Sequence, residues 1–345
     1  YLRFYGVNND QTTIHSFVTT THQQLRNLKD TLQEQSNRVL DADDKYLNLL
    51  GFNNEPRIYP KDIWSNTSLP IVVSYVMEGQ ESQAVGLINN FARILPNNTI
   101  LIYNLGLGNY GLKTLYNYCN HSRCQVITYS LTEYPSHVED EDSHAFRPLI
   151  IQDALQKAGA ILFVECDRRL NKHVTTSTVL NLYDYVVGNS GIMTWPLPSK
   201  NAVSSRTHKK MFEYFHTDAD NFLFLEMVSA DSLLIVNTKD IHHNVMLPWV
   251  QCALIQNCIH PIGAQSAGCR FNKKPQYRYS GCHSYDASAL NIVLGIKFKF
   301  DNTKYTYQYI DEMFRTVDLR KAVAELQGLE QNATSDGKMF IESST

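Results

Sequence analysis

Apolar runs alternate with amphipathic segments along the middle of the chain. Short runs rich in β-branched and aromatic residues predict strands at PIVVSYVM, TILIYNL, CQVITYSL and AILFVEC. Segments with helical periodicity lie between them, at residues 81–95, 112–119 and 149–159. In the first segment one face is apolar, formed by Ala84, Leu87, Ile88, Phe91, Ile94 and Leu95. This alternation predicts an α/β fold with a mostly parallel sheet, right-handed crossovers and helices on both faces.

The pattern is less regular from about residue 171 onward. Helices are predicted near THKKMFEYF, VMLPWVQCALIQNC and DASALNIVLGI, and a further strand at SLLIVNT. The polar tail that begins at about residue 329 is predicted to be loose.

A heptad pattern precedes the α/β region. Val18, Leu25, Leu32 and Val39 recur every seven residues within a polar segment. Two interpretations stand: an amphipathic helix packed on the main domain, or a stem helix that pairs with a second chain to form a homodimer. We divide the chain into a helical stem and connector at 1–63, an α/β domain at 64–328 and a flexible tail at 329–345.

Composition narrows the class of protein. With 43% apolar residues and 31 basic against 34 acidic side chains, a disordered chain and a general nucleic-acid binder are both disfavoured. No apolar run reaches the ~18 residues of a membrane span. The chain starts at Tyr1 without an initiating Met, so we expect that a natural amino-terminal segment has been removed.

Cysteines and glycosylation patterns point to an oxidising compartment. The seven cysteines fit up to three disulfides and one free thiol, and no zinc-type spacing occurs. Acceptor patterns for N-glycosylation lie at Asn66, Asn97, Asn120 and Asn332. Together these features favour the secretory pathway over the cytosol.

The stretch NLGLGNYG matches the spacing G-x-G-x-x-G with Gly106, Gly108 and Gly111. A dinucleotide fingerprint follows the first strand of its unit, whereas this stretch follows the second. Glu133 does lie at the distance of a ribose-binding acid. We interpret the glycines as a tight turn between strand and helix, and keep an NAD-dependent oxidoreductase as the less favoured alternative.

An acidic pair ends the fourth predicted strand, in AILFVECDRRL. Alternation places Glu165 and Asp167 on the same side, where two carboxylates repel unless a cation lies between them. Oxygen ligands suit Mg²⁺ or Mn²⁺, which can in turn hold a diphosphate. The alternative is a strand end that enters solvent, with Asp167 paired to Arg168 or Arg169.

The E-C-D sequence resembles the D-x-D metal motif of GT-A-type glycosyltransferases, with Glu in the first place. Residues 69–294, including HAFRPLIIQDAL, AILFVECDRRL and GCHSYDASALN, resemble a group of nucleotide-diphospho-sugar transferase-like proteins that is well represented in nematodes. The resemblance implies a GT-A-type, Rossmann-like nucleotide-sugar-binding domain. It also implies Mn²⁺- or Mg²⁺-dependent transfer of a hexosyl or N-acetylhexosaminyl group from a UDP-linked donor to a glycan hydroxyl.

The resemblance also assigns the metal and the catalytic acid. Asp167 would be the principal metal ligand, and Glu165 its partner nearer the ribose. In GCHSYDASALN, Ala287 replaces the usual Gln of a D-Q-x-x-L-N helix start. Asp286 would act as general base or sugar contact, or as a helix N-cap. His283 would complete the metal shell, or be an exposed or disulfide-adjacent histidine.

Further residues follow from the same resemblance. The donor would be bound by Arg147 at its phosphates and by strand-end residues at its base and ribose: Ser74, Tyr75 and Asn104. His208 and Trp249 would border the acceptor, although aromatic residues such as Tyr75 and Trp249 are as readily explained by packing. Cys166, on the opposite side of the strand from the acids, is expected to be the free thiol.

The interpretation reached from the sequence is a glycosyltransferase ectodomain. We expect it to face the Golgi or secretory lumen, to have been tethered by a membrane span before Tyr1, and to bind a nucleotide sugar and a glycan acceptor. The altered E-C-D and D-A-S-A-L-N motifs leave a second interpretation open, a catalytically inactive GT-A-fold module that binds glycan or protein.

Overall fold

The computed structural model describes residues 38–342 except 60, 62–66, 120–121, 273 and 308–312, and only the backbone of 332–342. The heptad segment before residue 38 lies outside the described residues, as do Trp64, near the expected domain boundary, and the sequons Asn66 and Asn120. Asn97 is exposed in the turn that enters the second strand, as a glycosylation acceptor must be.

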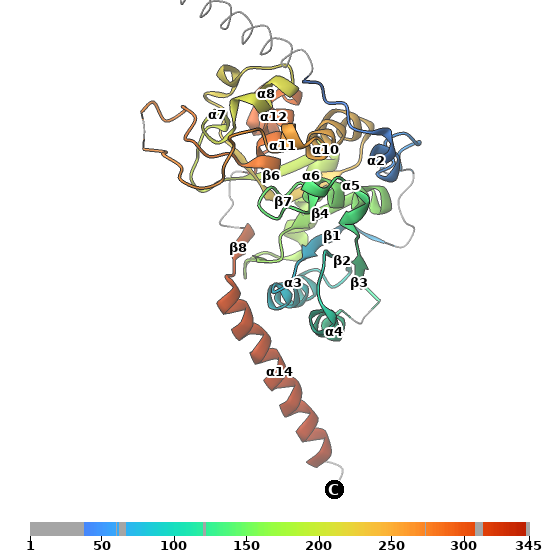
Figure 1. Cartoon of the computed structure of the whole chain (residues 1–345). Helices are drawn as coiled ribbons and strands as arrows, with labels where there is room; N and C mark the ends of the chain where they lie inside the picture. Colours follow the sequence, from blue (N-terminus) through green and yellow to red (C-terminus); the bar gives the residue numbers. More distant parts are fainter. Residues whose placement is uncertain are drawn as a thin grey trace, which may run out of the picture.

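The described residues form a central sheet of six strands in the order β3-β2-β1-β4-β7-β6 (Figure 1). Pairing is parallel from β3 through β4, whereas β7 is antiparallel to both of its neighbours. The mostly parallel α/β fold that the pattern predicted is therefore confirmed. A small antiparallel sheet joins β5 and β8. The strand bounds are β1 Ser68–Val76, β2 Asn98–Asn104, β3 Cys124–Thr128, β4 Ala160–Val164, β5 Arg168–Leu170, β6 Ile192–Pro196, β7 Val228–Val236 and β8 Phe314–Thr316.

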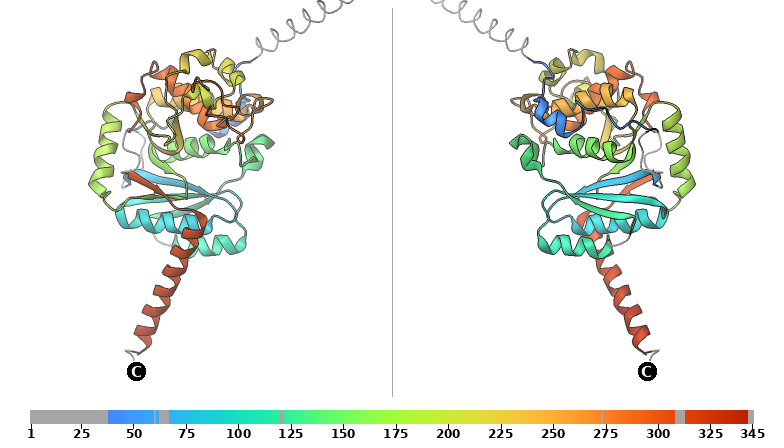
Figure 2. Two further views of the ribbon diagram at one scale, coloured as in Figure 1. Left: turned by 90° about the vertical axis from the view of Figure 1, so that its left-hand side faces the viewer. Right: turned by 90° about the vertical axis from the view of Figure 1, so that its right-hand side faces the viewer.

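Helices cover both faces of the sheet (Figure 2). Their bounds are α2 Asp44–Leu49, α3 Glu81–Ile94, α4 Asn109–Tyr118, α5 Phe146–Ala158, α6 Thr176–Gly188, α7 Val203–Arg206, α8 Lys209–Tyr214, α9 Lys239–Ile241, α10 Leu247–Leu254, α11 Gln256–Ile259, α12 Tyr285–Lys297 and α14 Leu319–Glu342. Single turns lie at η1 Leu131–Glu133, η2 Ser136–Glu139, η3 Ala219–Phe222, η4 His242–Met246 and η5 Asn302–Lys304.

Strand alternation divides the interior into two apolar cores. In β1, Ile71, Val73 and Tyr75 face a core completed by α5, α10 and α12. Val72 and Val76 face the other core, which α3, α4 and α6 complete. Because both faces of the sheet are covered, its strands are mostly apolar, and Glu165 and Asp167 follow the end of β4.

The carboxyl-terminal segment forms a long helix. α14 runs continuously from Leu319 to Glu342 and projects from the body (Figure 1), so the backbone is helical across residue 329, where the sequence predicts that a flexible tail begins. Ala322, Leu326 and Leu329 recur at helical spacing and pack against the core beside α3. This apolar face and the many helix-forming residues around it explain why a polar composition still gives a helix.

All seven cysteines lie in the described residues. Disulfides join Cys119 to Cys124, Cys252 to Cys258, and Cys269 to Cys282. Cys166 is the free thiol and is buried, so the expected count of three disulfides and the identity of the unpaired cysteine are both confirmed.

A buried histidine makes the stability of the fold sensitive to pH. His242 is fully buried against Phe52, and neither of its ring nitrogens has a hydrogen-bond partner among the described residues. Burial, with a smaller effect of His243, lowers the pKa of His242 to about 4, below the ~6.5 of an unfolded chain. The stability that the neutral ring contributes is present above pH ~6.5 and is lost as the pH falls toward ~4.

We therefore expect His242→Phe to reduce the pH dependence of stability. Between pH 7 and pH 5, the free energy of unfolding of the native chain should fall by about 1–2 kcal/mol more than that of the variant. Urea denaturation at the two pH values measures this difference. The control is His173→Gln at an exposed position, which should keep the native pH dependence. If the free energy of unfolding fell equally in the native chain and in His242→Phe, His242 would be excluded as the source of the pH dependence.

Candidate functional site

The site lies where the direction of strand addition reverses. β2 and β3 extend the sheet on one side of β1, and β4, β7 and β6 extend it on the other. In open α/β sheets, ligands bind at the carboxyl ends of the strands at such a switch point. Here those ends carry Tyr75, near the end of β1, and Glu165, directly after β4.

A buried polar cluster joins four residues that the sequence analysis singled out. The Tyr75 hydroxyl donates to Glu165 Oε1 over 3.0 Å. The Arg147 guanidinium forms ion pairs with Glu165 Oε1 and with Asp286 Oδ2, the second at 2.5 Å. α5 and α12 bring Arg147 and Asp286 here from positions 139 residues apart, since each residue lies in the first turn of its helix.

The charges of this cluster are mutually dependent. Burial raises the pKa of Glu165, but Arg147 and His144 outweigh it, so its pKa lies below the usual range. Burial also raises the pKa of Asp286, and Arg147 offsets only part of that effect. Burial opposes the charge of Arg147, yet Asp286 and Glu165 hold the pKa of the guanidinium above its ordinary value. The cluster therefore keeps a charged arginine between two acids.

Asp167 differs from the acids of this cluster. Its Oδ1 is buried and has no hydrogen-bond partner among the described residues, and the nearest cationic nitrogen, Arg168 Nε, lies 3.6 Å away. The guanidinium of Arg168 is instead held by Asp231 and by Thr316. Burial and the repulsion of Glu165 raise the pKa of Asp167 to about 6. This carboxylate therefore has an oxygen available to a cation.

The ring of His283 bonds to groups outside the polar cluster and does not contact Asp167. Its Nδ1 accepts from the backbone N–H of His208 over 3.1 Å, and its Nε2 lies 3.1 Å from the carbonyl oxygen of Ile259. Burial lowers the pKa of His283 to about 3, which keeps the ring neutral. Both ring nitrogens are thus used within the protein. Among the described residues, no group of three or more His, Cys, Asp or Glu side chains is arranged to hold a metal ion.

The aromatic candidates are packed into the protein. Trp249 is fully buried and its indole N–H donates to the carbonyl oxygen of Asp286 over 2.9 Å. The ring of Tyr75 lies against Phe146 and Phe163. Both rings are therefore packed in the interior, as the alternative interpretation of Tyr75 and Trp249 expected. The indole N–H of Trp249 helps to position Asp286, and the hydroxyl of Tyr75 helps to position Glu165. His208 accepts from the backbone of Lys210 at the start of α8.

The glycine stretch forms a turn between β2 and α4. Asn104 at the end of β2 accepts from the backbone N–H groups of Gly106 and Leu107. Gly106 has a φ of 135°, a conformation that favours glycine. The N–H of Gly108, at the start of α4, donates to Glu78 Oε2 over 2.7 Å. A carboxylate therefore already occupies the place that a pyrophosphate would take in a dinucleotide site. Ser74, on β1, is fully buried.

Two residues near the site were missed from the sequence. His144, which precedes α5, lies 4.0 Å from Glu165 Oε1. Asp231 lies on β7, and its carbonyl oxygen accepts from the backbone N–H of Glu165 over 2.9 Å. The available signal for Asp231 was that it is the one charged residue of β7, VSADSLLIV.

Comparison with known proteins gives distant matches. A family model described as "Protein of unknown function (DUF1647)" matches residues 11–152, less than half of the chain. No curated protein sequence matches. Solved structures that match include the bifunctional glycosyltransferase WbbM (11% identity, TM-score 0.44, 73% of this chain and 42% of that one) and mouse xyloside xylosyltransferase 1 (9%, 0.39, 69% and 84%). A third is an active-site mutant of LgtC (11%, 0.36, 55% and 64%).

All three matches share 11% identity or less with this chain, and all have TM-scores below 0.5. The chain spans less than half of the length of WbbM. Because the TM-scores are below 0.5, we base the proposed function on the acidic strand end itself.

Proposed function

We propose that this chain is a glycosyltransferase that moves a hexosyl or N-acetylhexosaminyl group from a UDP-linked donor to a glycan hydroxyl. The observation that carries the proposal is the buried carboxylate oxygen of Asp167, which accepts no hydrogen bond among the described residues, beside Glu165 at the switch point of the sheet. Mg²⁺ and similar ions are commonly held by one or two carboxylates together with substrate phosphates and water. Asp167 fits such an ion, with Glu165 as its neighbouring acid.

The residues of the site have different proposed roles in binding and in proton transfer. A divalent cation at Asp167 would supply charge neutralisation for the leaving diphosphate. Glu165 stays ionised because Arg147 and Tyr75 bind it. We propose Asp286 as general base if the reaction inverts, or as sugar contact if it retains. For the first role it must exchange its bond with Arg147 for the acceptor hydroxyl, which frees one edge of the guanidinium for the diphosphate.

Nucleotide and metal together should stabilise the protein. At a hundred times its Kd, UDP adds about 2.7 kcal/mol to the free energy of unfolding. We expect UDP with Mn²⁺ to raise the melting temperature, and chelation to remove most of the rise. Absence of a metal-dependent shift with any nucleotide would contradict the proposal, and a shift with NAD that survives chelation would favour the oxidoreductase alternative.

A catalytically inactive module that binds glycan or protein is the second candidate. It is favoured by Arg147, which neutralises both Glu165 and Asp286, and by the absence of a three-ligand metal group in the described part of the chain. A screen of nucleotide sugars for Mn²⁺-dependent hydrolysis separates the two candidates. Hydrolysis of one donor supports the enzyme, whereas glycan binding without hydrolysis of any donor supports the module.

We propose that this protein is located in the Golgi or another secretory lumen. The disulfides joining six of the seven cysteines support an oxidising compartment. Within the described ranges, no helix combines the length and apolar character of a membrane span.

A further inference from the structure

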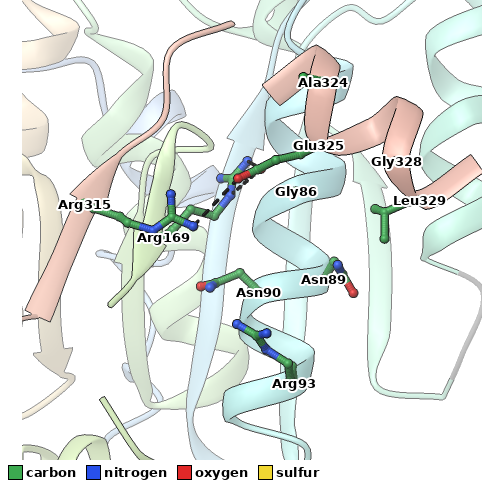
Figure 3. Close-up of a pocket in the computed structure, with 10 residues that line it drawn as sticks. All are labelled: Gly86, Asn89, Asn90, Arg93, Arg169, Arg315, Ala324, Glu325, Gly328 and Leu329. Carbon is green, nitrogen blue, oxygen red and sulfur yellow. Dashed lines mark hydrogen bonds and ion pairs between the residues drawn. The ribbon is translucent and has the colours of Figure 1, made fainter. Parts of the chain in front are cut away.

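A polar pocket lies between α3, α14 and the β5–β8 sheet, and none of the residues that line it belongs to the cluster at the acidic strand end (Figure 3). Its volume is about 360 Å³, within the range of small-ligand sites. The helix α14 forms one wall, so the pocket exists because the carboxyl-terminal segment is helical and docked on α3.

Three arginines line this pocket from three different elements. Arg93 comes from α3, Arg169 from β5 and Arg315 from β8 (Figure 3). Glu325 of α14 is the one acidic residue among the described lining residues. Three guanidinium groups against a single carboxylate leave an excess of positive charge at the pocket wall.

The innermost guanidinium is held in place by the fold. Arg169 is only 1% exposed, and it donates to Glu325 Oε2 over 3.2 Å and to the carbonyl oxygen of Cys166 over 2.8 Å. A Cβ at position 86 would lie 2.1 Å from Arg169 Nη2, so Gly86 leaves the space that the guanidinium fills. This buried, preorganised cation is what distinguishes the pocket from scattered surface charge.

Glu325 does not satisfy the two outer arginines. Arg315 Nη2 lies 3.7 Å from Glu325 Oε1, beyond hydrogen-bond distance, and its side chain is 46% exposed. Arg93 is exposed and pairs with no carboxylate in the part of the chain that the structure describes. Their N–H groups are therefore available to an anion, and guanidinium groups bind phosphate and sulfate through paired N–H donors.

We propose that this pocket binds a sugar that carries a phosphate or sulfate group, with the anion between Arg93, Arg169 and Arg315. The remaining wall suits a sugar ring, because it offers the exposed amide of Asn89 and the apolar side chain of Leu329. The proposal is independent of the glycosyltransferase assignment, since it needs neither nucleotide nor metal.

The ligand class is tested by calorimetric titration of the full chain at constant ionic strength. N-acetylglucosamine 6-sulfate and glucose 6-phosphate represent the anionic sugars, N-acetylglucosamine and glucose are their uncharged parent sugars, and inorganic sulfate and phosphate are the free anions. We expect at least one ester to bind, its parent sugar not to bind, and the free anion to bind about tenfold more weakly. No binding of either ester would overturn the proposal, and equal affinity for ester and free anion would overturn the sugar part of it.

The location is tested with charge variants of residues that line the pocket. Arg93→Gln and Arg315→Gln should each weaken binding about tenfold, because each removes a charged donor. Glu325→Gln should tighten binding, because it removes the carboxylate that competes for Arg169. Arg320→Gln is the matched control on α14, outside the lining residues. The location would be overturned if Arg320→Gln weakened binding as much as the pocket variants do. It would also be overturned if Arg93→Gln and Arg315→Gln both left the affinity unchanged. Thermal unfolding verifies that each variant is folded.

Discussion

Asp167→Asn should strongly reduce Mn²⁺-dependent sugar transfer while the chain stays folded. The substitution keeps the size of the side chain and removes the charge that would hold the cation beside the leaving diphosphate. Loss of one group that stabilises transition-state charge lowers turnover by roughly a hundredfold to a thousandfold. The measurement is the rate of release of UDP from the donor found by the nucleotide-sugar screen.

Stability gives this variant a second, independent readout. Because burial and Glu165 raise the pKa of Asp167 to about 6, the ionised carboxylate is unfavourable in the folded chain without metal. Asp167→Asn should therefore melt at the same or a higher temperature than the native chain at pH 7. Asp184→Asn, at an exposed position of α6, is the control for the change of charge. Retained turnover in Asp167→Asn would place the metal elsewhere.

Arg147→Met should destabilise the fold by about 3–5 kcal/mol. The methionine fills a similar volume but leaves the buried Asp286 and the half-buried Glu165 without their cation, and breaking a buried ion pair from one side has a cost of this size. Chemical denaturation at pH 7 measures the loss. The same substitution should also raise the pKa of Glu165, which Arg147 now holds low.

A double-mutant cycle separates the lost ion pair from lost packing. Asp286→Asn should itself destabilise the chain, because Arg147 then keeps a single partner. Combined with Arg147→Met, it should cost less than the sum of the two single changes. Strict additivity would mean that the Arg147–Asp286 contact contributes no coupling energy.

Local patterns in the sequence predict much of the sheet. The expected strand at 70–77 corresponds to β1 at Ser68–Val76, and the expected helix at 81–95 to α3 at Glu81–Ile94. The strand β6 and the helix α6 were not predicted. β6 is only five residues long and has Thr194 at its centre, so its apolar pattern is weak.

The acidic strand end was visible in the sequence because Glu165 and Asp167 are neighbours in one short motif. The sequence did not show that Glu165 binds Arg147 and Tyr75, whereas Asp167 keeps an oxygen without a hydrogen bond among the described residues. Periodicity indicates which face of an element is buried, but not which distant side chain it meets. The contact of Arg147 with Asp286 therefore needed the structure, as did the hydrogen bonds that engage both nitrogens of His283.

The direction of β7 affects how this protein can diversify. Within the described sheet, β7 runs antiparallel to its neighbours β4 and β6. It therefore begins at the edge of the sheet where β4 and β6 end. The segment between β6 and β7, residues 197–227, therefore leaves and re-enters the sheet at the ligand-binding edge. Hydrogen-bonded pairs such as Val164 with Ser232 fix the register of β7 independently of that segment. Under the proposed function, insertions or deletions there would reshape the surface that an acceptor meets while Glu165, Asp167 and Asp231 keep their positions.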